Sequence, residues 1–188
     1  MGTVLIILLV LVLVVVVGGG LYLMTAYSGL VRLRNKIESA FAQIDVQLNR
    51  RHDLIPNLVE TVKGYATHEQ ETLQAVIEAR NAAVAAEGTE AKAEAEGALS
   101  GMLRQVFALS EAYPDLKANT QFLDLQRQLS ETEDRIAYSR QYFNDNVRTY
   151  NTKIQSFPQN LIAKQLGFTE RQYFQADEES RANVQVEF

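Results

Sequence analysis

Hydrophobic residues fill the amino end of the chain without interruption. No charged side chain occurs before Arg32, and the run from Val4 to Val17 is entirely aliphatic. A helix rises about 1.5 Å per residue, so the uncharged stretch 3–27 is long enough to cross a hydrocarbon core of roughly 30 Å. The pattern therefore predicts a transmembrane anchor, which we assign to residues 1–27.

A cleaved signal peptide is the alternative interpretation of this segment, because it also contains an apolar run. Such a peptide has a basic amino-terminal region and a cleavage site of small residues. Here no Lys or Arg precedes the apolar run, and Gly18, Gly19 and Gly20 are followed by Leu, Tyr, Leu and Met. We therefore expect the segment to be retained as an anchor. The three glycines either let anchor helices pack closely or form a flexible break near the membrane surface.

After the anchor, apolar residues recur in alternating steps of four and three. The positions of this first stripe are Ile37, Phe41, Ile44, Leu48, Arg51, Ile55, Leu58 and Val62. Because the spacing does not slip at Pro56, we predict one helix over residues 28–63 that bends at the proline and stops at Gly64. A helix that begins at Pro56 is the alternative, since proline suits the first helical position, but it would be only about two turns long.

Three further helical segments are predicted, over residues 68–86, 90–113 and 116–157. Thr67 and Gln70 have the spacing of a capping box at the start of the first one. The expected core positions are Leu73, Val76, Ile77, Arg80 and Val84, then Ala95, Leu99, Met102, Val106, Leu109 and Tyr113, then Phe122, Leu125, Leu129, Ile136, Phe143, Val147, Tyr150, Ile154 and Phe157. Strand signals are nearly absent. The predicted class is all-α, with one amino-terminal transmembrane helix followed by an elongated antiparallel bundle of about four helices over residues 28–157.

Residues 158–188 are expected to form a docked carboxyl-terminal tail. Pro158 ends the last long helix, and residues 159–166 predict a short helix that stops at Gly167. Disordered segments are usually poor in aromatic residues, whereas this tail is not, so it should dock on its own bundle or on a neighbouring subunit. The candidate oligomer contacts are Gly18, Gly19, Gly20, Phe168, Tyr173, Phe174 and Phe188.

The cations nearest the anchor predict its orientation. Arg32, Arg34 and Lys36 follow the apolar run directly, and none precedes it. By the positive-inside rule, the protein crosses the inner (plasma) membrane of the cell once, with its amino terminus outside and its carboxyl-terminal domain in the cytoplasm. A dedicated lipid-binding cluster usually holds roughly four to eight cations, so these three are read as an orientation signal. The net charge of −5 argues against a nucleic-acid partner.

A polar block interrupts the first stripe near the proline. Arg51 lies on the stripe itself, and Pro56 leaves the carbonyl of His52 without its usual helical donor. Buried polar groups are best attested as devices that fix helix register, so we favour a structural network over catalysis. We expect its members to satisfy one another around the bend: Arg50, Arg51, His52, Asp53, Pro56 and Asn57.

Signatures of enzymes are missing from the chain. The sequence HEQET at 68–72 differs from the zinc-protease motif HExxH because Thr72 stands where the second histidine would be. The chain has two histidines and no cysteine, and it has neither a Gly-rich phosphate loop nor a nucleophile elbow. We therefore expect no enzymatic activity, no cofactor and no metal.

Four segments together resemble the LemA family. They are YSGLVRLRN at 27–35, QIDVQLNRRHDLIPNLVETVKGYATHE at 43–69, AR at 79–80 and RQYFNDNVRTYNTKIQSFP at 140–158. The resemblance implies a membrane protein with one amino-terminal helix and a helical bundle in the cytoplasm, and no settled biochemical activity. Relatives include a protein implicated in forming magnetosome membranes, and members often lie beside genes for a membrane-bound metalloprotease. The resemblance therefore implies a role in membrane organisation or quality control.

Two functions are compatible with these features. In the first, the protein is a membrane-anchored scaffold that self-assembles as a homo-oligomer at the inner face of the lipid bilayer. In the second, it is an adaptor or regulatory subunit that binds a membrane protease or transporter through the acidic surface of its bundle. We favour the scaffold.

Overall fold

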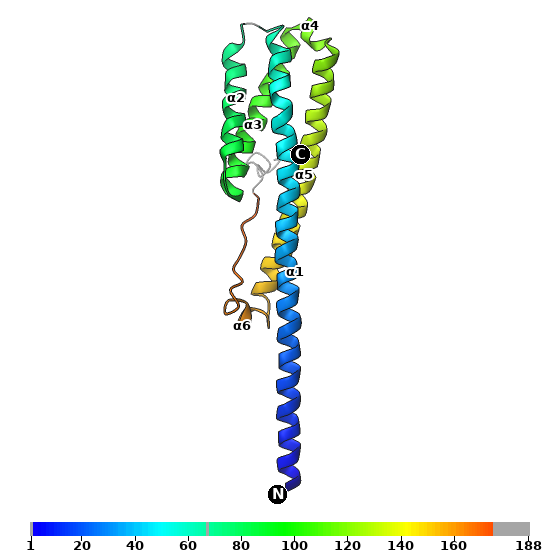
Figure 1. Cartoon of the computed structure of the whole chain (residues 1–188), viewed down its shortest axis with the longest axis vertical. Helices are drawn as coiled ribbons and strands as arrows, with labels where there is room; N and C mark the ends of the chain where they lie inside the picture. Colours follow the sequence, from blue (N-terminus) through cyan, green and yellow to red (C-terminus); the bar gives the residue numbers. More distant parts are fainter. Residues whose placement is uncertain (1, 67, 175–188) are drawn as a thin grey trace, which may run out of the picture. The chain divides into compact units, whose positions relative to one another are not determined.

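The computed structural model describes residues 2–66 and 68–174, and every regular element within them is a helix (Figure 1). The long helices are α1 (Gly2–Lys63), α2 (Gln70–Ala85), α3 (Thr89–Leu109) and α5 (Thr120–Gln155). The short ones are the 3-10 helix η1 (Ser110–Ala112), α4 (Pro114–Lys117) and α6 (Asn160–Ala163). The predicted all-α class is confirmed.

Helix α1 contains both the apolar amino-terminal run and the first predicted bundle helix. It is assigned as one helix from Gly2 to Lys63, with Pro56 inside it. The prediction that the helix passes through Pro56 is confirmed, and the alternative start at Pro56 is wrong. Gly18, Gly19 and Gly20 also lie within α1. The proline is tolerated because its side chain is exposed, beside the buried stripe.

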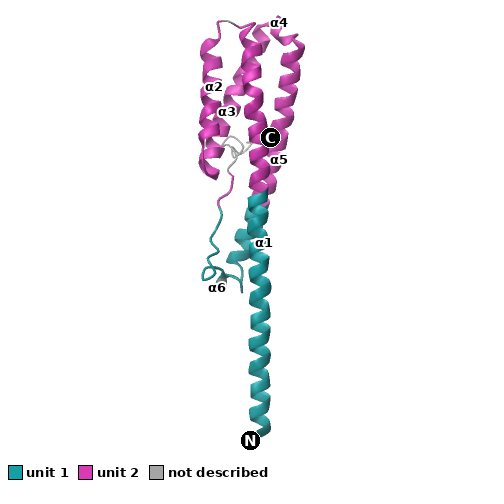
Figure 2. Ribbon diagram, in the orientation of Figure 1, with its two compact units in different colours: residues 1–39, 146–171 teal, residues 40–145, 172–188 magenta. Residues whose placement is uncertain are grey.

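The chain forms two compact units, each built from segments that are far apart in sequence (Figure 2). Unit 1 comprises residues 1–39 and 146–171, and unit 2 comprises residues 40–145 and 172–188. Residues 1, 67 and 175–188 lie outside the described part of the chain, and with them Phe188, one of the candidate oligomer contacts.

Unit 2 is a bundle in which parts of α1 and α5 pack with α2, α3 and α4 around one apolar core. Each element contributes the stripe that its helical period predicts. The core residues are Ile55, Leu58, Val59, Val62, Ala66, Leu73, Val76, Ala83, Leu99, Leu103, Val106, Leu116, Phe122, Leu125 and Leu129. Gly88 joins α2 to α3 with a φ of 82°, a backbone conformation that glycine adopts without the steric cost of a side chain.

The structure corrects several predicted positions. Val84 is exposed and Ala83 is buried in its place, and Phe157 is 77% exposed. In α3 the buried face contains Ala93, Glu96, Leu99, Leu103 and Val106, so Ala95 and Met102 lie at its border. The sequence did not identify the buried face of α3 correctly, because the helix is rich in alanine and its apolar stripe is poorly defined.

Two helix starts also differ from the prediction. Glu69 is the N-cap of α2 and makes no capping hydrogen bond through its side chain, while Thr67 lies outside the described residues. The last long helix begins at Thr120, after the separate turn α4, because the side chain of Asn119 accepts a hydrogen bond from the amide of Phe122 at 2.9 Å. Asparagine is a favoured N-cap for this reason.

The first part of the tail docks on its own chain. In unit 1, Phe168 is buried and packs edge-on against Tyr27, with 5.6 Å between ring centroids. In unit 2, Phe174 is 1% exposed and lies 6.5 Å from the ring of Phe41. The guanidinium of Arg140 lies 4.8 Å above the Phe174 ring. Phe168 and Phe174 therefore do not present a free surface to a neighbouring subunit, whereas Tyr173 is 43% exposed.

Candidate functional site

The main polar site lies in the interior of unit 2, where Arg51 of α1 meets Glu96 of α3. Arg51 Nη2 donates to the Glu96 carboxylate, and both side chains are almost fully buried. Arg51 Nη1 donates to Ser100 Oγ at 2.9 Å and also to the carboxylate of Glu133 on α5. The arginine thus joins three helices of the bundle, and its charge is balanced by two carboxylates.

His52 and Arg80 extend this site towards α2. His52 Nε2 lies 2.8 Å from the second oxygen of Glu96, so one carboxylate contacts both an arginine and a histidine. Arg80 Nε donates to the backbone carbonyl of His52 at 3.1 Å. This is the carbonyl that Pro56, four residues later, cannot satisfy because proline has no N–H. The helix therefore tolerates the proline without leaving an unsatisfied acceptor.

The surroundings of Glu96 keep it ionised. Burial by itself would raise the pKa of this carboxyl group, because it disfavours the charged form. The hydrogen bond with His52 and the positive charge of Arg51 outweigh that effect, so the pKa of Glu96 lies below its ordinary value. Glu96 is therefore the anionic centre of the site.

These contacts correct the prediction that the polar residues of α1 near Pro56 bind one another. Arg50, Asp53 and Asn57 are exposed, and the partners of Arg51 and His52 come from other helices. The reason is geometric, since residues one or two apart in a helix point in different directions and do not face each other. Sequence reasoning missed Glu96, Ser100 and Glu133. A usable signal was present, because Glu96 stands three residues before Leu99 on the buried stripe of α3.

A pocket of about 290 Å³ lies beside Arg51 in unit 2. Its lining is mixed, with Ser100, Arg104 and Glu133 next to Leu103 and Phe107. Within the described part of the chain, no group of three or more His, Cys, Asp or Glu side chains could hold a metal ion. His68 of the sequence HEQET is exposed. The arrangement can hold three helices in register, but it offers no activated nucleophile of the kind that covalent catalysis uses.

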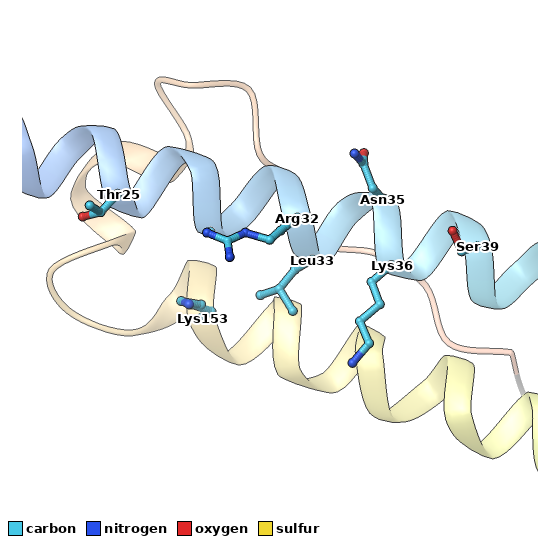
Figure 3. A pocket seen from close by; sticks show the side chains of 8 residues that line it. Thr25, Arg32, Leu33, Asn35, Lys36, Ser39 and Lys153 are labelled. Carbon is cyan, nitrogen blue, oxygen red and sulfur yellow. The ribbon is translucent and has the colours of Figure 1, made fainter.

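A second polar site lies in unit 1, where α1 leaves its apolar run. A hollow of about 680 Å³ is lined there by Thr25, Gly29, Arg32, Leu33, Asn35, Lys36, Ser39 and Lys153 (Figure 3). Lys153 comes from α5, and its Nζ would be 3.6 Å from a Cβ placed on Gly29. This is an ordinary van der Waals distance, so the lysine nitrogen lies directly beside α1 at Gly29. Sequence reasoning did not connect Lys153 with Arg32 and Lys36, because more than a hundred residues separate them.

Comparison with known proteins identifies the family. The model of the LemA family matches residues 40–188, and the chain belongs to this family. The predicted resemblance is thus confirmed. Protein LemA of Metamycoplasma hominis is 29% identical over 160 residues, which cover 82% of this chain and 71% of that protein. Magnetosome protein MamQ 2 of Paramagnetospirillum magneticum is 26% identical over 179 residues, which cover 81% of this chain and 66% of that protein.

A further relative has a similar extent of match. Magnetosome protein MamQ of Magnetospirillum gryphiswaldense is 26% identical over 178 residues, which cover 81% of this chain and 65% of that protein. The chain thus spans just under two thirds of the length of the MamQ relatives. One described helix, α1, is long and apolar enough to cross a membrane. The fold and the comparisons together define a helical, membrane-associated protein of the LemA family.

Proposed function

We propose that the protein is a non-enzymatic, membrane-anchored scaffold that self-assembles at the inner face of the membrane and takes part in membrane organisation or quality control. The observation that carries this proposal is the exposure of the apolar part of α1. None of the most hydrophobic part of this helix is buried inside the protein. A surface of this kind is stable only in hydrocarbon or against another apolar surface.

The continuity of α1 favours a retained anchor over a cleaved signal peptide. The apolar run and the first bundle helix belong to one helix, Gly2–Lys63. Cleavage after the glycines would cut inside that helix, where the backbone is hydrogen-bonded and poorly suited to a protease. The cations that follow at Arg32, Arg34 and Lys36 favour an amino terminus outside and a carboxyl-terminal domain in the cytoplasm.

A role without catalysis is supported by the buried site of unit 2. Arg51, His52 and Glu96 bind one another, and Glu96 is held in its charged form by those contacts. Groups that are already paired in this way stabilise the packing of helices and are not poised to activate a substrate. Relatives named LemA and MamQ are compatible with the same interpretation.

Self-assembly is assigned to the anchor, because the tail aromatics Phe168 and Phe174 are buried on their own chain. Gly18, Gly19 and Gly20 have no other atoms within 4 Å of an added Cβ. In lipid, small residues allow two helices to approach closely enough for backbone packing. Full-length protein in detergent, measured by multi-angle light scattering, tests this assignment. We expect a homogeneous oligomer whose mass falls in the variant Gly18→Leu/Gly19→Leu/Gly20→Leu.

A matched control replaces three other anchor residues, Val14→Leu/Val15→Leu/Val16→Leu, and should leave the mass unchanged. The helical circular dichroism of both variants should equal that of the parent protein. A monomeric parent protein, or equal masses for the parent and the glycine variant, would refute assembly through the glycines.

An adaptor is the second candidate function, and the charge of the bundle favours it. Residues 40–145 hold ten Lys and Arg against 17 Asp and Glu, so this segment has a net charge of −7. A net negative charge of this size attracts a basic partner. The same light-scattering measurement separates the two functions, since a monomer that co-purifies with a second membrane protein supports the adaptor.

A further inference from the structure

Unit 1 gathers basic residues from two distant parts of the sequence. Its segments, residues 1–39 and 146–171, hold seven Lys and Arg against two Asp and Glu, which gives a net charge of +5. The cations are Arg32, Arg34, Lys36, Arg148, Lys153, Lys164 and Arg171. The first three alone are too few for a lipid-binding cluster, whereas seven lie within the usual range of roughly four to eight.

Three of these seven cations, Arg32, Lys36 and Lys153, line the hollow of unit 1. Figure 3 shows the side chains of Arg32 and Lys36 extending from α1 towards α5, on the side where Lys153 lies. Thr25, Asn35 and Ser39 also line the hollow, although Asn35 extends from the side of α1 that faces away from α5. Basic side chains that face one another across two helices match the chemistry of a phosphate group.

The two acidic residues of unit 1 do not belong to the lining of this hollow. Glu38 lies 3.9 Å from Arg171, and Glu170 accepts a hydrogen bond from Gln155 at 2.8 Å. The charged residues that line the hollow, Arg32, Lys36 and Lys153, are all positive.

An apolar corner lies on the same unit, in the segment that follows α5. Phe157, Leu161 and Leu166 are 77%, 61% and 44% exposed, and Lys164 is exposed between them. The segment returns to the end of the apolar run of α1, because Phe168 packs against Tyr27. Exposed apolar side chains next to cations are typical of segments that lie in the interface of a membrane.

We infer that unit 1 binds the headgroups of anionic phospholipids, with a headgroup phosphate held by Arg32, Lys36 and Lys153 and with the corner of Phe157, Leu161 and Leu166 inserted in the interfacial layer. This inference rests on the proposed membrane position of the anchor. The anchor brings the hollow to the headgroup layer, since Thr25 of its lining lies near the end of the anchor and Gly29 follows the anchor closely. The apolar corner favours a lipid over free phosphate, because a free ion would leave these side chains in water.

Tryptophan fluorescence tests the position of the corner, because the chain contains no tryptophan. Single reporters Phe157→Trp and Leu161→Trp are placed in the full-length protein in nanodiscs that contain phosphatidylglycerol brominated near the headgroup end of its acyl chains. We expect strong quenching of both reporters. Tyr138→Trp, at a 73% exposed position of unit 2, is the control that should stay unquenched. Quenching of the corner reporters no greater than that of Tyr138→Trp would overturn the insertion.

A reporter in the anchor separates failure of this inference from failure of the proposed function. Leu13→Trp lies in the apolar run and should be quenched by lipid brominated deep in its acyl chains, whether or not the corner inserts. If Leu13→Trp is quenched and the corner reporters are not, the anchor remains in the membrane and the lipid-binding surface is refuted. If Leu13→Trp is also unquenched, the membrane anchor itself is refuted.

Selectivity for the headgroup is measured by native mass spectrometry of protein extracted from vesicles with equal amounts of phosphatidylglycerol and phosphatidylcholine. The parent protein should retain phosphatidylglycerol preferentially, and Arg32→Gln/Lys36→Gln/Lys153→Gln should lower the ratio of the two retained lipids by at least about tenfold. The control Lys63→Gln/Lys117→Gln/Arg127→Gln removes three exposed cations of unit 2 and should leave the ratio unchanged.

Inorganic phosphate distinguishes the two sources of the same chemical group. Phosphate added in excess during extraction should leave the retained phosphatidylglycerol unchanged. Complete displacement by phosphate would assign the hollow to a free anion and overturn the lipid site. An unchanged lipid ratio in the triple glutamine variant of unit 1 would overturn it as well.

Discussion

The guanidinium of Arg51 donates a hydrogen bond to the carboxylate of Glu96, 45 residues further along the chain, and the two side chains are 1% and 0% exposed. An ion pair this deep in a bundle gains little net stability from its charges, since both must be removed from water. It does penalise any arrangement of α1 and α3 that separates the partners. We therefore interpret the pair as the element that fixes the register of these two helices.

Breaking this pair from one side should be more harmful than replacing both partners. Arg51→Met leaves the Glu96 charge with His52 alone, and we expect a loss of about 3 to 5 kcal/mol in the free energy of unfolding. The double variant Arg51→Met/Glu96→Leu removes both charges and should recover most of that loss. Arg50→Met, at the exposed neighbouring position, is the matched control and should change stability little.

Chemical denaturation of the full-length protein in detergent, followed by circular dichroism, measures these differences. If Arg51→Met/Glu96→Leu is as unstable as Arg51→Met, the ion pair stabilises the folded protein more than apolar side chains at the same two positions do.

The lowered pKa of Glu96 gives a pH dependence of stability with a definite sign. Because the folded-state pKa lies below that of the unfolded chain, the contribution of Glu96 is fully present above the unfolded value, about 4.3, and is lost as the pH falls through the folded value. The melting temperature of the parent protein should therefore exceed that of Glu96→Gln most clearly near pH 7. The difference should shrink as the pH is lowered from about 5 towards 3.

Glu71→Gln, at an exposed position in the first turn of α2, serves as the control for the loss of one carboxylate. A difference between the parent protein and Glu96→Gln that stayed constant over this pH range would contradict the assignment of Glu96 as a buried anion.

The tail should stabilise its own subunit. Asn144 holds the backbone of Phe174 at two points, since its amide group donates to the Phe174 carbonyl at 2.9 Å and accepts from the Phe174 amide at 2.8 Å. Phe174→Ala should lower the free energy of unfolding by about 3 to 5 kcal/mol, and Asn144→Ala by about 1 to 3 kcal/mol. Tyr173→Ala, next to the buried ring but half exposed, should cost much less.

Denaturation curves and light scattering on the same samples decide where the tail acts. Docking within one subunit predicts lower stability with an unchanged oligomer mass in the Phe174→Ala variant. A lower mass with unchanged stability would instead indicate that the ring contacts a neighbouring subunit.

The orientation of the anchor can be tested with single cysteines, since the chain has none of its own. Tyr138→Cys lies at a well-exposed position of the bundle, so its thiol should react readily with any reagent that reaches it. With the bundle in the cytoplasm, a membrane-impermeant thiol reagent should label it only after the cells are permeabilised. Thr3→Cys, ahead of the apolar run, should show the opposite pattern. Labelling of Tyr138→Cys in intact cells would reverse the proposed orientation.

The sequence by itself determined the helices and most of the core. Alternating steps of four and three place one face of a helix towards its neighbours, so a local pattern was enough to identify Ile44, Leu58, Phe122 and Ile136 as buried. The same pattern predicted that α1 continues through Pro56, because the spacing of the apolar stripe does not change there. It failed at Val84 and in α3, where alanine makes the apolar face ambiguous.

Only the tertiary structure decided which polar residues meet. The sequence placed Arg51 on a buried stripe, but its pairing with Glu96 depends on how α3 packs against α1. The cations of unit 1 are a second case, since Lys153 joins Arg32 and Lys36 only after the chain has folded back on itself. Periodicity reports which face of each helix is buried, whereas contacts between distant residues depend on packing that no local pattern contains.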